Sequence, residues 1–430
     1  MSNTRIAAIH ARQIMDCRMR PMVEVDIITN EGFRGRGSAP TGTSVGKYES
    51  YVLRDNDKNH FEGLSVYKAV TMINNVISPR IIGMDVLDQK AFDAALIEMD
   101  GTEKKSTLGG NTLYSLSMAC ARAGAASRKQ SLVDYMRTEP ITSLPIPTFN
   151  SINGGHSERI HMGFQEFTFS PYKAETMTEA IEIASKVFKK IGVVIARYKP
   201  DGFAEIGHAY GWAPPSSDPN IIMQLLHQAV VDCGYEDKIA YALDCASSVQ
   251  YDPHDGTYEY NGRRIDRDEM IGRVKELTEK YPFLYIEDIL DENDWEGFQL
   301  AAKTLNQTVV IGDDLIVTSL DRLKKAYESK TVEGFVFKPN QIGTITESLE
   351  TFHYAQERGM LAIPSTRGGG VVDDIVMELA VALQAPIVKN SAPRGGERIY
   401  SLNCLYRASD EYPNAKMFDF NKYIRFGMKQ

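Results

Sequence analysis

Polar and charged residues end a series of short apolar segments in the second half of the chain. They are Asp244 in "IAYALD", Glu287 in "FLYIED", Asp313 in "VVIGDD", Lys338 in "GFVFK", Ser365 in "MLAIPS" and Lys389 in "APIVK". Parallel strands bring their carboxyl ends to one mouth, where the catalytic groups of β/α barrels gather. We therefore expect these six side chains to point into one site.

Three of the six are carboxylates without histidine or cysteine partners. Asp244, Glu287 and Asp313 form a hard oxygen donor set, which suits Mg²⁺, with Mn²⁺ as a substitute. Each also has an ordinary structural role open to it, because an aspartate after a strand usually caps a helix or pairs with an arginine. Asp288 and Asp314 directly follow two of the candidates, so either member of each pair can be the capping residue.

Lys338, at the end of "GFVFK", is the candidate base. A single lysine at a strand end more often extends toward solvent or makes a structural ion pair. A neighbouring cation disfavours the ammonium form, however, and would lower the pKa of Lys338 enough for it to accept a proton. A proton on carbon next to a carboxylate requires such a site, since its removal creates an enolate-like dianion that a metal stabilises. Lys389 would then hold the substrate carboxylate.

The segments that carry these residues repeat along the chain. From Glu287 onward an apolar run recurs about every 25 residues and a helical pattern follows each run, which is the period of a β/α unit. The pattern predicts an α/β fold with a parallel barrel or sheet covered by helices. Residues 1–50 alternate as strands do, and three helical patterns follow. Three prolines in 138–150 suit a junction, so we place an N-terminal α+β domain at 1–137 and the catalytic domain at 138–430.

The composition narrows the class of protein. The formal net charge of −9 argues against nucleic-acid and anionic-membrane partners, while it allows a basic pocket for a small anion. The five cysteines are scattered and form no C-x-x-C pair, which indicates reduced thiols. No signal peptide and no apolar run long enough to span a bilayer is apparent, so we expect a cytoplasmic protein.

Further motifs resemble those of the enolase family over nearly the whole chain. They are "ARQIMDCRMRPMVEVD", "PTGTSVG", "YVLRDND", "FNSINGG", "FQEFTFSP", "YIEDILDENDW", "IGDDLIVTS", "FKPNQIGTITE" and "ERIYSLNCLYR". Enolase-superfamily sites are known to use a lysine or histidine base with one or two Mg²⁺ ions, so the chemistry argued above is general to that family. The resemblance implies a small N-terminal α+β domain, a modified (β/α)8 barrel of the TIM-like kind, and a homodimer or homo-octamer.

The resemblance also implies roles for single residues. Asp244, Glu287 and Asp313 match the ligands of a first magnesium ion, and Ser44 matches the loop serine that reaches a second. Lys338 matches the base that removes the C2 proton of 2-phosphoglycerate. The remaining matches are to substrate-binding and acid-side residues: Lys389 near the substrate carboxylate, Arg367 at the phosphate, Glu166 and its neighbour Gln165 on the acid side, and Ser365 and His156 in the surrounding motifs.

The active-site motifs also depart from the family pattern. The family's Gly-Asp-Glu-Gly-Gly reads "GHAYG" at 207–211, so Ala209 replaces the glutamate that helps to expel the C3 hydroxyl as water. Ser-His-Arg-Ser reads "STRG" at 365–368, "GGHS" exchanges the order of His156 and Ser157, and "CRMR" adds Arg20.

Three functions are therefore open. The first is an enolase that converts 2-phosphoglycerate to phosphoenolpyruvate, with Glu166, His156, His208 or Tyr210 as the acid. The loss of a general acid costs about 10²- to 10⁴-fold in rate, so a measurable rate can remain. The second is an enolase-like enzyme for another phosphorylated, phosphonate or sulfonated acid, such as a carboxyphosphonoenolpyruvate synthase. The third is a non-catalytic paralogue, which is disfavoured because packing does not require the carboxylates and lysines together. Both enzymes share Mg²⁺-assisted removal of an α proton by Lys338.

Overall fold

The N-terminal part of the chain is a three-stranded sheet covered by helices. The computed structural model describes residues 4–42, 45–154 and 162–427. Strands β1 (Ile6–Met15), β2 (Pro21–Thr29) and β3 (Arg34–Ser38) form an antiparallel sheet in that order. Helix α4 (Gly110–Ser127) packs on β2 and β3. This close approach requires Gly37, because a Cβ there would lie 2.1 Å from the carbonyl oxygen of Ser115.

Short helices complete this part. They are α1 (Tyr67–Met72), α2 (Ser78–Ile81), α3 (Gln89–Asp100) and α5 (Leu132–Met136). The apolar residues of α1, α2 and α3 share one buried core with those of β1, β2 and α4. Leu132 and Val133 of α5 belong instead to the larger core that the barrel helices share. The helix α3 begins at Asp88, whose carboxylate accepts the backbone N–H of Ala91, and ends at Gly101 in the left-handed conformation. The three helical patterns expected from the sequence are thus helical.

The second part is an eight-stranded barrel. Its strands are ordered β14 (Leu361–Pro364), β13 (Gly334–Phe337), β12 (Val309–Gly312), β11 (Phe283–Glu287), β7 (Ala240–Asp244), β6 (Glu166–Ser170), β5 (Ile146–Asn153) and β15 (Ile387–Lys389). A parallel bridge between Ser365 and Lys389 joins the two outer strands. Only β6 is antiparallel to its neighbours in this barrel. The predicted β/α barrel is therefore confirmed, with one reversed strand.

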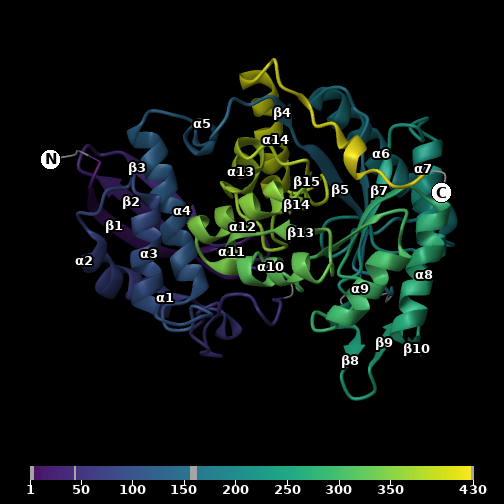
Figure 1. Cartoon of the computed structure of the whole chain (residues 1–430), viewed down its shortest axis with the longest axis horizontal. Helices are drawn as coiled ribbons and strands as arrows, with labels where there is room; N and C mark the ends of the chain where they lie inside the picture. The colour runs from purple at the N-terminus through teal and green to yellow at the C-terminus, as the bar shows by residue number, and fades with distance from the viewer. Residues whose placement is uncertain (1–3, 43–44, 155–161, 428–430) are drawn as a thin grey trace.

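Helices cover the outside of the barrel (Figure 1). They are α6 (Met177–Tyr198), α7 (Pro219–Val231), α8 (Arg267–Lys280), α9 (Trp295–Thr304), α10 (Leu320–Glu328), α11 (Pro339–Ile342), α12 (Ile345–Glu357), α13 (Val376–Ala382) and α14 (Gly396–Glu411). Five further strands are small additions: the meander β8 (Tyr251–Asp252), β9 (Thr257–Tyr260) and β10 (Arg263–Ile265), and β4 (Ser143–Leu144) paired with β16 (Lys416–Met417).

Alternate residues of the barrel strands face opposite sides. One buried group consists of strand residues and the C-terminal Phe420, and includes Ala242, Ile311 and Val336. The residues between them pack with the helices, as Leu243, Val310 and Phe337 do. Because side chains alternate along a strand, a residue two positions after a member of the first group points the same way, into the barrel. Asp244, Asp313 and Lys338 hold these positions.

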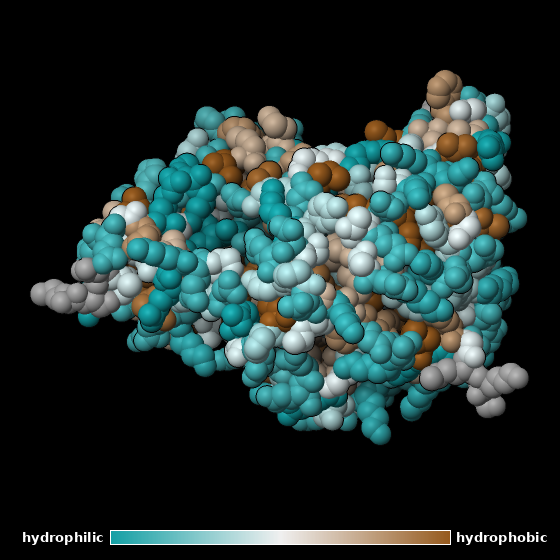
Figure 2. Space-filling view, turned by 90° about the horizontal axis from the view of Figure 1, so that it is seen from above, coloured by the Kyte–Doolittle hydropathy of each residue, from teal (hydrophilic) through white to brown (hydrophobic). Residues whose placement is uncertain are grey.

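The N-terminal part lies against the barrel helices α11 and α12, as Figure 1 shows. Ser117 of α4 accepts the backbone N–H of Ile345 at 2.9 Å, and Asp93 of α3 accepts that of Thr346 at 3.0 Å. The face seen in Figure 2 is mostly hydrophilic, with hydrophobic residues in small scattered groups. Within the described ranges, none of the helices combines the length and the apolar character that crossing a bilayer requires.

Candidate active site

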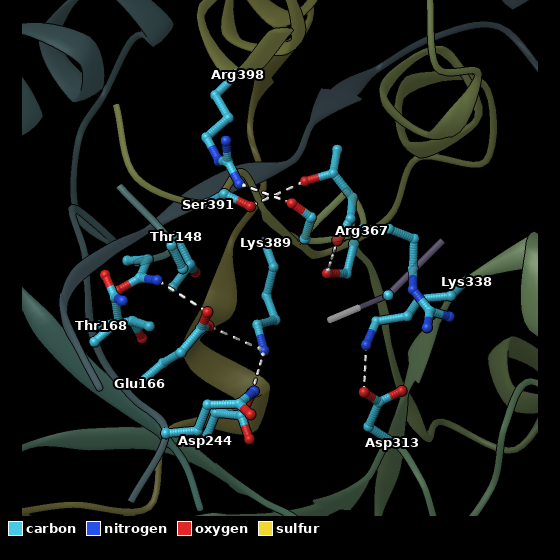
Figure 3. Close-up of a pocket in the computed structure, with 18 of the residues that line it drawn as sticks. Thr148, Glu166, Thr168, Asp244, Asp313, Lys338, Arg367, Lys389, Ser391 and Arg398 are labelled. Carbon is cyan, nitrogen blue, oxygen red and sulfur yellow. Dashed lines mark hydrogen bonds and ion pairs between the residues drawn. The ribbon is translucent and has the colours of Figure 1, made fainter. Parts of the chain in front are cut away.

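The strand ends bring the predicted residues to one mouth of the barrel. Asp244 and Glu287 are the last residues of the neighbouring strands β7 and β11 and lie in register. Asp313, Lys338 and Ser365 directly follow β12, β13 and β14, and Lys389 ends β15. All of these except Glu287, which is 1% exposed, line a single pocket together with Glu166, Gln165 and Arg367 (Figure 3). The expectation of one convergent site holds for these residues.

Lys389 faces three carboxylates. Its Nζ lies 2.5 Å from Glu287 Oε2, 3.2 Å from Asp244 Oδ2 and 3.7 Å from Glu166 Oε2. Burial disfavours the ammonium, but the three negative charges outweigh it and raise the pKa of Lys389. Burial, followed by the charge of Asp244, raises the pKa of Glu287 well above its usual range. One cation for three buried carboxylates leaves an excess of negative charge at this side of the pocket.

Lys338 makes an ion pair with Asp313. Asp313 also accepts Nε2–H of Gln341 at 2.8 Å, and the backbone N–H of Lys338 donates to Thr318 Oγ1 at 2.9 Å. Burial lowers the pKa of Lys338 but the charge of Asp313 outweighs it, so the net pKa is raised. This direction is opposite to that expected beside a metal ion, because the nearest charged group here is a carboxylate.

A second acidic group lies beside Asp313. Oxygen atoms of Asp288, Asp313 and Asp314 lie within 4.8 Å of one another, whereas Asp244, Glu287 and Asp313 do not form such a group among the described residues. Instead, Lys389 contacts Asp244 and Glu287, and Lys338 pairs with Asp313. Asp288 accepts the backbone N–H groups of Asp313 at 2.9 Å and Asp314 at 2.8 Å, so it orients the β12 loop rather than capping a helix.

The donor set fits a hard divalent cation. The buried acidic groups at this mouth offer carboxylate oxygens. Burial disfavours their charged forms and raises the pKa values of Glu287, Asp288 and Asp314. The pKa of Asp314 is raised to about 8. An added positive charge would relieve this penalty. Oxygen ligands without histidine or cysteine are those that Mg²⁺ selects.

Glu166, the first residue of β6, is the third carboxylate that faces Lys389. Its Oε1 accepts Nδ2–H of Asn150 at 2.9 Å, and burial raises its pKa despite the nearby ammonium of Lys389. A carboxyl group with a raised pKa keeps its proton to higher pH and can act as an acid. Gln165, the neighbouring residue, donates to Asp244 Oδ2 at 3.4 Å.

Arg367 is held by a residue that the motif comparison did not single out. Glu49 accepts two hydrogen bonds from its guanidinium, each 3.0 Å long, and both side chains are 4% exposed. The two residues are 318 positions apart in the sequence. The neighbouring Ser365 Oγ donates to the Thr366 carbonyl at 3.1 Å, and Thr366 Oγ1 lies 3.1 Å from Ser391 Oγ.

Two of the four candidate acids are engaged elsewhere. His208 Nε2 lies 3.0 Å from Arg18 Nη1, and because arginine only donates, this nitrogen must be the acceptor and carry no proton. Partial burial and the charges of Arg18 and Arg398 also lower the pKa of His208. Tyr210 donates its hydroxyl to the Cys17 carbonyl at 3.0 Å. Ser44 and His156, predicted from motifs, lie outside the described residues.

A β/α barrel whose mouth combines buried carboxylates with two lysines is typical of enzymes that form and stabilise an enolate. The comparisons with known proteins agree with that class. The family model "Enolase, N-terminal domain" matches residues 6–136, and "Enolase, C-terminal TIM barrel domain" matches residues 141–426.

Full-length relatives are similar throughout. The chain is 37% identical over 410 residues to the enolase of Methanococcus aeolicus, covering 95% of this chain and 96% of the relative. It is 36% identical over 411 residues to that of Methanococcus maripaludis (96% and 96%) and 36% identical over 408 residues to that of Methanosarcina barkeri (95% and 95%). The chain belongs to the enolase family and is a carbon–oxygen lyase of the hydro-lyase type.

Proposed function

We propose that this enzyme removes the proton α to the carboxylate of a small phosphorylated acid, with Lys338 as the base, and then eliminates a β substituent. The family default is the dehydration of 2-phosphoglycerate to phosphoenolpyruvate. The observation that carries the proposal is the placement of Lys338 and Lys389 on two sides of one pocket, where Lys338 pairs with Asp313 and Lys389 faces Glu287 and Asp244. Lys338 is positioned to take the proton, and Lys389 to bind the substrate carboxylate.

We propose Asp244, Glu287 and Asp313 as the residues that hold Mg²⁺, with Ser44 at a second ion that binds with the substrate. When bound, the cation supplies positive charge that stabilises an enolate and offsets the hold of Asp313 on the ammonium of Lys338. Arg367, with Glu49 fixing its plane, is proposed to bind the phosphate. Gln165, Ser365 and His156 are proposed to contact the remaining polar atoms of the substrate.

Glu166 is proposed as the acid that protonates the leaving hydroxyl. Its raised pKa and its place in the pocket support this role. His208 Nε2 carries no proton and the Tyr210 hydroxyl donates to the Cys17 carbonyl, which argues against either residue as the acid. Ala209 contributes no proton. A second candidate function, elimination from a different phosphorylated or phosphonate acid, is supported by that same alanine and by the replacement of the family's histidine by Thr366 and of its serine by Gly368.

The test measures proton removal separately from elimination. The protein is incubated with Mg²⁺ and 2-phosphoglycerate in D₂O, and deuterium at C2 is followed by NMR together with the absorbance of phosphoenolpyruvate. Exchange with elimination supports the family default, whereas exchange without elimination supports the second function. Lys338→Ala should abolish exchange, while Lys324→Ala, an exposed lysine of α10, should not. Exchange that survives Lys338→Ala would refute the base assignment.

The organisation of the protein is also proposed from the family. We propose a division into 1–137 and 138–430, a cytoplasmic location, and a homodimer or homo-octamer. Light scattering of the purified protein measures the mass against that of the 48.0 kDa chain. Independent unfolding of a fragment comprising 1–137 would support the division.

A further inference from the structure

The pocket has a second end, around Arg398, that the proposed reaction does not use. It is lined by His208 and Ala209 of the turn at 207–211, Asn153 of β5, Gly368 and Arg398 of α14, and we call it the distal end. Two of these positions are small, with alanine at 209 and glycine at 368. In Figure 3, Arg398 reaches toward the pocket from the side away from Asp244 and Asp313.

Polar atoms at the distal end are buried without partners. Asn153 is 1% exposed, and neither Oδ1 nor Nδ2 has a hydrogen-bond partner among the residues that the structure describes. Arg398 is 3% exposed and its Nε is likewise unpartnered in that part of the chain. Buried polar groups are nearly always hydrogen-bonded, since an unmade bond costs free energy. Both residues line the pocket, so a bound molecule is the natural source of the missing partners.

The charge at the distal end is positive. Arg398 pairs with Glu397, and its Nη2 donates to the Gly368 carbonyl over 3.4 Å. Arg18 makes no ion pair with any described carboxylate: it donates to the same carbonyl at 3.1 Å and to the His208 carbonyl at 3.3 Å. The two guanidiniums are thus balanced by one directly paired carboxylate. The two guanidiniums would attract an anion to this end. The carboxylates of Asp244 and Asp313 lie on the other side of the pocket (Figure 3).

Arg18 keeps this end from serving as an acid. It holds the unprotonated Nε2 of His208, and Arg398 lies 4.4 Å from the Tyr210 ring while the Tyr210 hydroxyl is used by Cys17. Arg18 and Arg398 thus both contact the turn. The Asn153 amide packs closely against Gly207 and Gly211, where a Cβ would lie 2.9 and 2.4 Å from it. A rigid, positively charged, non-acidic wall can bind but cannot donate a proton to a leaving group.

We propose that the distal end binds a second anionic group of the substrate, attached to the carbon that carries the leaving group. The substrate is then a phosphorylated hydroxy acid with an additional carboxylate, phosphonate or sulfonate, contacted by Arg398 and Asn153. Arg18 is a positioning residue that supports the turn. This inference rests on the proposed function, because it places the reacting carbon beside Lys338.

Two synthetic analogues of 2-phosphoglycerate form a matched pair that tests the inference. In 2-phosphotartrate one C3 hydrogen is replaced by a carboxylate, and in 2-phosphoerythronate it is replaced by a neutral hydroxymethyl group. Calorimetric titration with Mg²⁺ present should give at least about tenfold tighter binding of 2-phosphotartrate, since a hydrogen bond to a charged group contributes roughly a factor of ten or more. Equal binding, or preference for 2-phosphoerythronate, would overturn the inference.

Variants locate the preference. Ala209→Glu places a carboxylate at the distal end and should remove the tenfold preference through like-charge repulsion, without touching the buried core. Arg398→Met should also remove it, while Arg407→Met, a matched change on the same helix away from the pocket, should not. A preference that survives Ala209→Glu and Arg398→Met would show that another region binds the added group and would overturn the assignment.

The outcome is separable from that of the proposed function. If C2 exchange of 2-phosphoglycerate occurs but the two analogues bind equally, only the distal-end inference is wrong. If no analogue binds with Mg²⁺ and 2-phosphoglycerate shows no exchange, the proposed function is wrong, and the inference that rests on it is wrong as well.

Discussion

Replacing Glu166 by glutamine should separate the two halves of the reaction. Glutamine has the shape of a protonated glutamate and its Oε1 can still accept Nδ2–H of Asn150, which is 2.9 Å away. It has no proton to transfer to a leaving group. The Glu166→Gln variant should therefore retain C2 exchange and lose elimination.

The magnitude of each effect follows from the contacts. Lys389 keeps its contacts with Glu287 at 2.5 Å and Asp244 at 3.2 Å, and its 3.7 Å separation from Glu166 is too long for a hydrogen bond. Exchange at C2 should therefore stay within about tenfold of the parent, because Lys389 keeps its two closer carboxylate partners and glutamine fills the same space as Glu166. Elimination should fall by about 10²- to 10⁴-fold, which corresponds to about 3 to 5 kcal/mol of transition-state stabilisation.

The assay follows both signals in one sample. Deuterium incorporation at C2 is read by NMR and product by absorbance, with whichever acid the parent enzyme turns over. Glu182→Gln, an exposed carboxylate of α6, is the control and should change neither rate. An equal fall in exchange and elimination would mean that Glu166 acts through Lys389 or the cation. Unchanged elimination would mean that another group is the acid.

Four substitutions test the stability of the fold, and the addition of Mg²⁺ tests the cation site. Burial raises the pKa of Asp374 to about 6, so the folded form holds its proton more tightly than the unfolded chain. The free energy of unfolding should therefore fall by about 3 kcal/mol as the pH rises from about 4 to about 6. Urea unfolding at both pH values should show no such fall for Asp374→Asn. Equal pH profiles of the two proteins would contradict this prediction. Gly37→Ala should lower the free energy of unfolding by about 1–3 kcal/mol, because its Cβ would overlap a carbonyl of α4, whereas Gly272→Ala in an uncrowded turn of α8 should raise it by roughly 0.5–1 kcal/mol. Glu49→Gln should cost about 3–5 kcal/mol because it removes the carboxylate that forms a buried ion pair with Arg367. A loss below about 1 kcal/mol would mean that the ion pair contributes little. Addition of Mg²⁺ after EDTA treatment should raise the melting temperature in a concentration-dependent way, since a ligand of the folded state stabilises it, and a constant melting temperature would argue against the site.

Much of the barrel was predictable because its signal is local. An apolar run followed by a helical pattern, repeated about every 25 residues, depends only on burial of strands on both faces and of one face of each helix. The inward direction of Lys338 follows from the same regularity, since it lies two residues after the inward Val336. The reversal of β6 is different: "EFTFS" has no property that sets its direction, which depends on its pairing with β5 and β7.

The sequence by itself determined which side chains stand at the mouth of the barrel, because side-chain alternation and strand length are properties of each segment alone. Only the tertiary structure decided what those side chains touch. Glu49 meets Arg367 across 318 residues, and Arg18 meets His208 across 190, through loops whose paths follow from the packing of the N-terminal part on the barrel. Such contacts join segments that carry no mutual periodic signal, so their partners are chosen by the folded geometry rather than by spacing along the chain.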